Sequence, residues 1–231
     1  MIDWRRSARA DGQFVREREW QTAQSVILWV DDAASMAFSS SDALPQKQAR
    51  ARLLALALGV LLIRGGERVG LTGFSLPPRG GRGQLERLAE ALARGAGEFA
   101  DFGVPEARGM VPQARAVFLS DFLGEIGAVE AALEKAAARG VRGALVMVLD
   151  PAEEAFPFEG RTIFESMSGS LLHETLKAGE LRARYSARLA ARKEALAGFA
   201  RGAGWRFHVH HTDASAQAAL LWLYGALEGA V

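Results

Sequence analysis

The chain has 231 residues, of which 49% are hydrophobic and 24% are charged, a composition typical of one globular domain with a substantial core. With 28 Lys and Arg residues against 27 Asp and Glu residues, the formal net charge is +1, so composition gives no reason to expect binding to nucleic acid or to an anionic membrane. The absence of cysteine excludes disulfides, thiolate metal sites and cysteine nucleophiles, and it is compatible with the cytoplasm.

No stretch of the sequence is typical of a secretory or membrane-spanning segment. Residues 1–10 are polar and rich in arginine, without the apolar run that follows the charged start of a signal peptide. The most apolar segment, Leu53–Ile63, is about half as long as the roughly 20 residues that span a bilayer. We therefore expect a cytoplasmic protein that is not attached to a membrane through these residues.

The first third of the chain predicts an edge strand, a buried strand and a long helix. Apolar and polar residues alternate in part over Gln13–Trp20, which favours an edge strand within an N-terminal segment, residues 1–24. Ser25–Val30 is a nearly continuous apolar run, as expected of a central strand in a parallel sheet. Pro45 is compatible with the first turn of a helix over Gln46–Ile63, whose second half is apolar nearly all round and is expected to be deeply buried.

Strands and helices continue to alternate in the rest of the chain. Apolar runs predict further strands, and segments with helical periodicity lie between them. This alternation is typical of an α/β fold in which a mostly parallel central sheet carries helices on both faces, and we expect residues 25–231 to form it as one unit. The further strands are expected at residues 68–74, 114–120, 143–149 and 205–210, and the further helices at 84–94, 126–138, 171–202 and 214–227.

Acidic residues follow the ends of several predicted strands. Asp31, Asp121, Asp150 and Asp213 each lie just beyond a strand, and in an open parallel sheet the ligand site lies off this carboxyl edge. If the strands that end at Asp31 and Asp121 are neighbours, Asp31, Ser35 and Asp121 converge on one polar patch. Oxygen ligands of this kind are preferred by Mg²⁺ and Mn²⁺.

Several short motifs together resemble those of one family. Val30–Met36 resembles the metal-ion-dependent adhesion motif Asp-x-Ser-x-Ser of von Willebrand A domains, which closes the first strand of that fold. As a set, and in their order along the chain, the motifs resemble those of the domain of unknown function 58 family. They are Ile2–Arg9, Val15–Glu19, Val30–Met36, Ser120–Phe122, Leu149–Glu153, Phe156–Phe158 and His211–Asp213.

This resemblance implies a von Willebrand A-like, Rossmann-like fold and a bacterial protein often encoded beside a MoxR-type AAA+ ATPase. Pairs of this kind are thought to act in chaperone-like assembly or metal insertion for other proteins. The expected partner is therefore the MoxR-type ATPase or one of its client proteins. Family members usually carry residues ahead of the motif Asp3-Trp4-Arg5, so we also expect this sequence to begin inside that motif block.

The adhesion motif departs from the family pattern at positions that bind metal. Ala33 stands where the motif has its first serine, and Pro77–Gly83, taken as the second loop, lacks the threonine that completes the site. We therefore expect a degenerate site with no certain cofactor, for which Mg²⁺ and Mn²⁺ are the candidate ions. The remaining candidate ligands are Asp31, Ser35 and Asp121, with Asp32 and Ser39 as alternatives for a lost ligand.

Simpler structural roles remain open for the same residues. Asp31 and Ser35 could serve only to cap the following turn, because both residue types bond nearby backbone N–H groups. Asp150 precedes a proline and could likewise initiate a turn. His208 and His210 share a strand face, but no carboxylate spacing supports a metal site there, and a satisfied or exposed role is favoured.

The sequence predicts a protein-interaction module and not an enzyme. The alternative is a Mg²⁺-dependent phosphohydrolase in which the strand-end carboxylates hold the ion and Asp31 is the nucleophile. The haloacid dehalogenase arrangement would need an aspartate at the position of Ala33, and we expect no lysine near these strand ends before Lys135. The predicted partner-binding surface consists of Asp31, Asp32, Ser35, Ser120, Asp121 and Asp150.

Overall fold

The computed structural model describes residues 23–95, 100–107, 109–165, 169 and 172–228. The edge strand predicted at Gln13–Trp20 and most of the N-terminal segment 1–24 lie outside these residues. The strands are β1 (Ser25–Val30), β2 (Arg68–Leu71), β3 (Leu76–Arg79), β4 (Arg115–Ser120), β5 (Arg142–Leu149), β6 (Thr162–Glu165), β7 (Leu172–Thr175) and β8 (Arg206–His211). The helices are the 3₁₀ helix η1 (Ala34–Ala37) and the α-helices α2 (Lys47–Arg64), α3 (Arg82–Arg94), α4 (Ile126–Ala137), α5 (Pro151–Ala155), α6 (Ala178–Gly202) and α7 (Ala216–Glu228).

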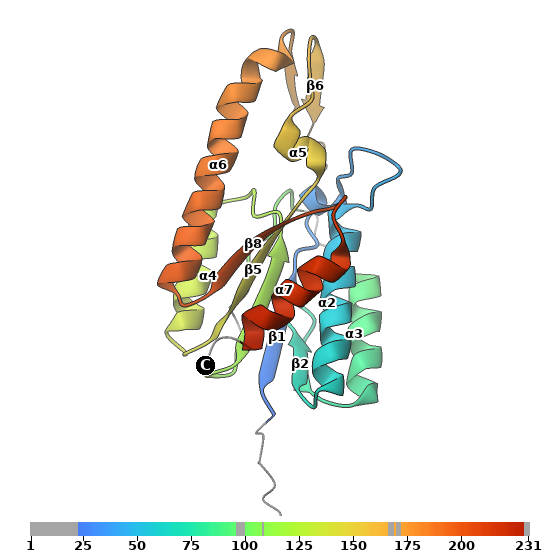
Figure 1. Ribbon diagram of the computed structural model, residues 1–231, viewed down its shortest axis with the longest axis vertical. Coiled ribbons are helices and arrows are strands. Elements are labelled where there is room, and N and C mark those ends of the chain that lie inside the picture. Colours follow the sequence, from blue (N-terminus) through green and yellow to red (C-terminus); the bar gives the residue numbers. More distant parts are fainter. Residues whose placement is uncertain (1–22, 96–99, 108, 166–168, 170–171, 229–231) are drawn as a thin grey trace, which may run out of the picture.

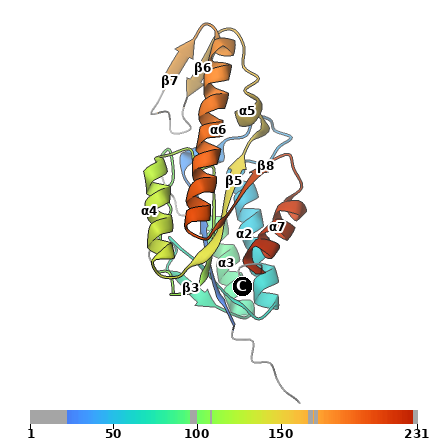
Figure 2. The same cartoon turned by 60° about the vertical axis from the view of Figure 1, so that its left-hand side comes forward.

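Six strands form the central sheet, in the order β3-β2-β1-β4-β5-β8. The neighbouring strands run parallel except for β2 and β3, which are antiparallel. Helices lie on both faces of this sheet, as Figures 1 and 2 show. The predicted α/β class with a mostly parallel, Rossmann-like sheet is therefore confirmed.

Alternate residues of the central strands enter two separate cores. On one face, Val26, Leu28 and Val30 of β1 pack with buried residues of α2, α3 and α7. On the other face, Ile27 and Trp29 pack with buried residues of α4 and α6. Because side chains alternate along a strand and both faces of β1 are covered, an almost unbroken apolar run is what this position requires.

Helix α2 is less deeply buried than its composition predicts. Leu54, Leu58 and Leu62 are buried in the core, whereas Leu53 is 53% exposed and Leu61 is 39% exposed. The helix packs against the sheet on one side and is flanked by α3 and α7 (Figure 1), so a stripe of it still faces solvent. The expectation of a helix buried all round is therefore wrong, because it lies in an outer layer and not at the centre of the fold.

The segment predicted as one irregular strand over 68–74 is a β-hairpin. Strand β2 ends at Leu71, the chain turns through Gly73 and Ser75 with positive φ angles of 80° and 50°, and β3 returns antiparallel. Pro77 and Pro78 lie on β3, the edge strand of the sheet. Proline has no N–H to donate to a ladder and is therefore found at edges and bulges, and the β2–β3 register is irregular at this point. Proline on an edge also discourages pairing with other chains.

Beyond β5 the chain forms an arm, which we define as α5, the hairpin β6–β7 and the first half of α6. The arm extends past the carboxyl edge of the sheet, at the top of Figure 1. The helix predicted over 171–202 is wrong at its start, because Leu172–Thr175 pairs with Thr162–Glu165 as a strand and α6 begins only at Ala178. The residues of β7 pair with residues 7 to 13 positions upstream, and helical periodicity within 171–202 does not report such pairing.

Candidate functional site

Parallel pairing brings the predicted strand-end residues to one edge of the sheet. Strand β1 pairs with β4 through Val30 and Leu119, and β4 pairs with β5 through Ser120 and Met147, so the three strands end side by side. The acidic residues Asp31, Asp121 and Asp150, which follow these strands, are at most 1% exposed, whereas Asp213 beyond β8 lies at the surface. The expected neighbourhood of the strands that end at Asp31 and Asp121 is confirmed.

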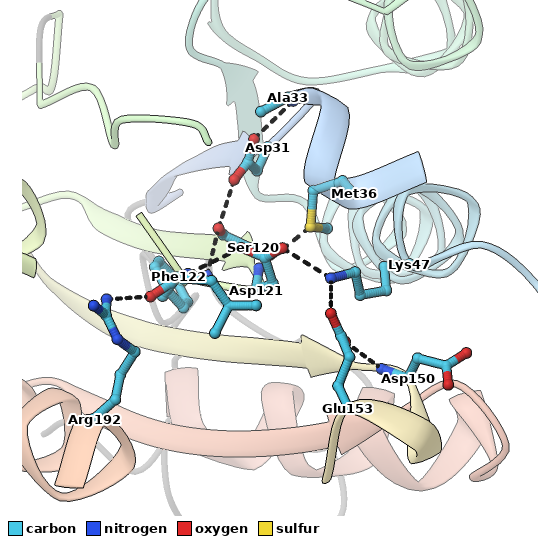
Figure 3. A network of polar contacts seen from close by, with 11 residues as sticks. Asp31, Ala33, Met36, Lys47, Ser120, Asp121, Phe122, Asp150, Glu153 and Arg192 are labelled. Carbon is cyan, nitrogen blue, oxygen red and sulfur yellow. Dashed lines mark hydrogen bonds and ion pairs between the residues drawn. The ribbon is translucent and has the colours of Figure 1, made fainter. Parts of the chain in front are cut away.

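Asp31 is held by a hydroxyl group and by the backbone of its own turn (Figure 3). The Oγ of Ser120 donates to Asp31 Oδ2 over 2.6 Å, and the backbone N–H of Ala33 donates to Asp31 Oδ1 over 2.9 Å. Ser120 Oγ in turn accepts from the N–H of Phe122 over 2.9 Å. Asp31 therefore holds the turn that follows β1 and also the end of β4. It caps its own turn and at the same time connects two neighbouring strands.

The loop that covers the adhesion-like motif is Ala100–Gly103, which precedes β4. The N–H groups of Ala34 and Ser35 donate to the carbonyls of Ala100 and Asp101, each over 2.9 Å. At Gly103 a Cβ atom would lie 2.2 Å from Asp31 Oδ1, so only glycine allows this backbone to lie against the carboxylate.

This arrangement corrects the expectation that Pro77–Gly83 is the second loop of the site. That stretch instead completes the edge strand β3 and begins α3. In the covering loop, Ala100 contacts the motif through its carbonyl oxygen, and it has no side-chain hydroxyl that could coordinate a cation. The placement of the second loop at Pro77–Gly83 is therefore wrong. The observed contact at Ala100 nevertheless also lacks the hydroxyl ligand that the motif would need.

The remaining motif residues differ in their bonding. Asp32 accepts from Gln48 over 2.8 Å and forms an ion pair with Arg52 over 2.7 Å, which ties the turn to α2. Ser39 Oγ donates to the carbonyls of its own loop. The Oγ of Ser35 is buried and has no hydrogen-bond partner among the residues that the structure describes. The two proposed replacement ligands are therefore engaged elsewhere.

Lys47 is a residue of this site that the sequence did not reveal. Its ammonium lies 2.9 Å from Asp121 Oδ2 and 2.6 Å from Glu153 Oε1, and its side chain is 1% exposed (Figure 3). This corrects the expectation that no lysine lies near these strand ends before Lys135. Asp31, Lys47, Ser120, Asp121 and Glu153 are called the edge cluster below.

The carboxylates keep Lys47 charged in spite of its burial. Burial alone lowers the pKa of Lys47, but the charges of Asp121 and Glu153 and their hydrogen bonds outweigh it, so the pKa is raised above its usual value. Burial is also the largest influence on Glu153, whose pKa is raised although Lys47 opposes this. The cluster therefore consists of a charged lysine between two carboxylates, and burial makes Glu153 easier to protonate than a glutamate in water.

Asp150 and Glu153 form a capping box at the start of α5, where the arm leaves the sheet. Asp150 Oδ1 accepts from the N–H of Ala152 over 2.8 Å, and Glu153 Oε2 accepts from the N–H of Asp150 over 2.9 Å. Asp150 Oδ2 also accepts from the N–H of Ser40 over 2.9 Å, which anchors the loop before α2. The turn-initiating alternative for Asp150 is thus observed in the structure.

The turn after β4 is held in an unfavourable conformation. Phe122 has a φ of 49°, in the left-handed region that favours glycine, and its side chain is buried. Arg192 of α6 donates to the carbonyls of Phe122 and Gly124, each over 2.7 Å (Figure 3). Together with the bond from the Phe122 N–H to Ser120, these contacts fix the loop that carries Asp121.

The three histidines of β8 do not share one site. His208 stacks on Trp222, with ring centroids 4.6 Å apart, and His211 Nε2 lies 2.5 Å from Glu154 Oε2. His210 Nε2 contacts Arg50 Nη1 over 3.0 Å, and burial first, then Arg50, lowers its pKa to about 4. Each ring therefore has a partner of its own, as the expected satisfied role requires.

The edge-cluster oxygens do not fit the divalent ion that the family resemblance implies. Both oxygens of Asp31 accept hydrogen bonds, and Asp121 accepts from the N–H of Leu123 at Oδ1 and from Lys47 at Oδ2. Of the predicted ligands Asp31, Ser35 and Asp121, Ser35 alone has a side-chain oxygen without a hydrogen-bond partner among the described residues. Mg²⁺ demands near-octahedral oxygen coordination, and Ala33 adds no side-chain oxygen to that hydroxyl.

Comparison with known proteins gives a family but no established activity. The sequence matches the family model described as "Protein of unknown function DUF58" over residues 1–195, and no protein with curated annotation matches. The fold is similar to an aerotolerance-related membrane protein from Bacteroides fragilis NCTC 9343 with multiple mutations to serines, with a TM-score of 0.54 and 15% identity over 90% of this chain and 99% of that one. It is also similar to the conserved hypothetical protein BatB from Bacteroides thetaiotaomicron, with a TM-score of 0.49 and 15% identity over 88% and 98%.

At 15% identity, the likeness to the Bacteroides fragilis protein shows a shared fold alone. In the part of this chain that the structure describes, no helix combines the length and apolar character needed to cross a bilayer. The family model, in contrast, matches residues 1–195 of a chain of 231 residues, which is well over half of it. The chain therefore belongs to the DUF58 family.

Proposed function

We propose that this chain is a protein-interaction module with a von Willebrand A-like architecture, whose contact surface is formed by the loops at the carboxyl edge of the sheet. The observation that supports this role is that the strand-end carboxylates are used to hold those loops. Asp31 binds the turn at Ala33, and Asp150 binds the loop at Ser40. Loops fixed in advance lose less conformational entropy when a partner binds.

The buried carboxylates shape this surface from beneath. Of the predicted partner-binding residues, Asp31, Ser120, Asp121 and Asp150 are at most 1% exposed, so their side chains offer almost no area for direct contact. The covering loop above Asp31 and the residue that follows it instead expose apolar groups, with Phe102 37% and Val104 57% exposed. Exposed apolar residues on a rigid loop are typical of interaction surfaces.

The proposed partner is a MoxR-type AAA+ ATPase or one of its client proteins, in chaperone-like assembly or metal insertion. Membership of the DUF58 family supports this choice, because the family resemblance carries that association. We accordingly place the module in the cytoplasm, where the ATP that such a partner consumes is available.

Burial also favours a binding role over the alternative of a Mg²⁺-dependent phosphohydrolase. A nucleophilic aspartate must reach the phosphoryl group of its substrate. Asp31 is 1% exposed, and its Oδ2 accepts the hydroxyl of Ser120. The nearby lysine does not change this, because Lys47 is equally buried and is paired with Asp121 and Glu153.

Calorimetric titration with the MoxR-type ATPase encoded beside this chain tests the proposal. The nucleotide state of the ATPase is held fixed, and the titration is repeated in Mg²⁺ and in EDTA. We expect Val104→Asp to weaken binding by about tenfold or more, because it places a charge in an apolar contact. Leu221→Asp is the matched control, since Leu221 is 66% exposed and lies on the helix α7, outside the covering loop.

Equal affinity of the two variants would contradict the location of the surface. If the unchanged chain does not bind the ATPase in either buffer, the partner assignment is wrong.

A further inference from the structure

Lys47 brings together three elements that are distant in the sequence. It is the first residue of α2, and its ammonium contacts Asp121 after β4 and Glu153 in α5 over 2.9 Å and 2.6 Å. Figure 3 shows the ammonium between the two carboxylates. A buried charge needs an opposite charge or hydrogen bonds to replace water, and at 1% exposure Lys47 and Asp121 obtain these from each other and not from solvent.

We infer that the ammonium of Lys47 takes the place of the divalent ion of an adhesion-type site, so that the carboxyl edge of this sheet assembles without metal. The inference rests on the proposed function, which identifies this edge as the adhesion-type surface. The Asp121 oxygen that would coordinate an ion accepts from Lys47 instead. The space beside Asp31 Oδ1 is taken by the backbone at Gly103.

This replacement changes what the surface can recognise. A bound divalent ion leaves a coordination position open to a carboxylate of the partner, whereas the Lys47 ammonium, on a side chain that is 1% exposed, is not accessible to one. The ammonium is also part of the chain and cannot be removed by a chelator. Partner binding through this edge is therefore independent of divalent ions and depends on the exposed rim, including Phe102 and Val104.

The replacement is tested by thermal unfolding of the full chain in EDTA and in excess Mn²⁺. We expect the unchanged chain to have the same midpoint in both buffers. Lys47→Met removes the cation and leaves Asp121 and Glu153 uncompensated, so its midpoint in EDTA falls by on the order of 10 °C. Mn²⁺ then raises the midpoint of this variant, because an ion that binds only the folded state stabilises it.

Two further variants separate cation replacement from a general loss of stability. Lys193→Met is the matched control, because Lys193 pairs with Glu154 over 2.5 Å outside the edge cluster. We expect its midpoint to be insensitive to Mn²⁺. The double variant Lys47→Met with Asp121→Asn removes the negative charge that would bind the ion, so Mn²⁺ should no longer raise its midpoint.

The inference is overturned if Mn²⁺ raises the midpoint of the unchanged chain as much as that of Lys47→Met, or if it raises neither. A Lys47→Met variant that folds only with Mn²⁺ supports replacement, and one that stays unfolded in both buffers contradicts it. The electron paramagnetic resonance signal of free Mn²⁺ gives a second test on the unchanged chain. We expect no loss of that signal, and a loss that Asp121→Asn abolishes would overturn the inference.

None of these measurements contains a partner protein. Failure to bind the ATPase would contradict the partner assignment, and the Mn²⁺ results would still test whether Lys47 replaces the ion. A metal-dependent midpoint in the unchanged chain would contradict the inference that Lys47 replaces the ion, and it would not contradict the proposed partner surface.

Discussion

The edge cluster and the arm contain ion pairs of nearly the same length in very different surroundings. In the edge cluster, Lys47 contacts Asp121 and Glu153 over 2.9 and 2.6 Å. On the arm, Arg161 contacts Glu174 over 2.7 Å. The side chains of Lys47 and Asp121 are each 1% exposed, whereas those of Arg161 and Glu174 are 71% and 43% exposed.

The distance between the charged atoms therefore does not indicate how much each ion pair contributes to the free energy of unfolding. An exposed pair exchanges contacts with water for a contact with its partner and gains little, about 0–1 kcal/mol. A buried pair can also be worth little compared with apolar residues, but removing one member leaves the other charge without water or partner, at a loss of about 3–5 kcal/mol. The edge cluster should therefore tolerate removal of a single charge far less well than the arm.

Replacing Lys47 with methionine gives the largest expected effect. Lys47→Met leaves two carboxylates facing each other without a counter-charge, and we expect the free energy of unfolding to fall by about 3–5 kcal/mol. Arg161→Met on the arm should change it by less than about 1 kcal/mol. Denaturant unfolding of both variants in EDTA measures the two differences.

A double-variant cycle sharpens this comparison. Adding Asp121→Asn to Lys47→Met neutralises the carboxylate that the first substitution left unpaired, so the second change should cost less than it does alone. Additive effects would contradict the direct coupling of Lys47 and Asp121.

His210, also at the carboxyl edge, gives the next effect, which depends on pH. Its pKa is lowered from 6.5 to about 4, first by burial and then by Arg50, so the folded chain binds this proton less readily than the unfolded chain. The contribution of His210 to stability is therefore fully present above pH 6.5 and is lost as pH falls toward 4. The expected loss is about 2 kcal/mol by about pH 5.

Unfolding free energies of the unchanged chain and His210→Asn, measured between neutral and acidic pH, check this sign. Carboxylates elsewhere titrate in both proteins, so the difference between the two curves isolates His210. We expect the two curves to converge as pH falls. A constant difference between them would show that His210 is not the group responsible.

The features predicted correctly from the sequence are those that the residues of a single strand indicate, such as burial of the strand on both faces. Strand β1 is buried on both faces, and this requires the apolar run that the sequence displays before Asp31. Strands β4 and β5 show the same run before Asp121 and Asp150. Alternation with helices then implies parallel strands, which place all three aspartates at one edge.

The features missed depend on contacts between distant segments. Lys47 stands at the start of a helix, where its sequence context is that of a solvated surface lysine. Its burial depends on an ion pair with Glu153, which lies 106 residues further along the chain. The covering loop contributes carbonyl oxygens of Ala100 and Asp101, which any residue provides. Glycine at position 103 was a usable signal, because close backbone approach to Asp31 requires it.

The arm itself provides the smallest and most discriminating prediction. Arg161 and Arg182 both form exposed ion pairs, with Glu174 over 2.7 Å and Glu159 over 3.0 Å. Arg182, however, is less exposed at 43% against 71%, and its Nε also donates to the carbonyl of Phe156 over 3.0 Å. If partners and burial matter more than charge pairing, the two arginines should differ in stability effect.

We expect Arg161→Ala to change the free energy of unfolding by less than about 0.5 kcal/mol, and raised salt to remove that difference. Arg182→Ala should cost about 1 kcal/mol, because it also removes a hydrogen bond to a backbone carbonyl, and this part should persist in high salt. Denaturant unfolding at low and high ionic strength measures both changes. If both substitutions changed the free energy of unfolding equally and high salt removed both changes, these arginines would stabilise the arm through charge pairing alone. Burial and backbone hydrogen bonds would then not explain the contrast with the edge cluster.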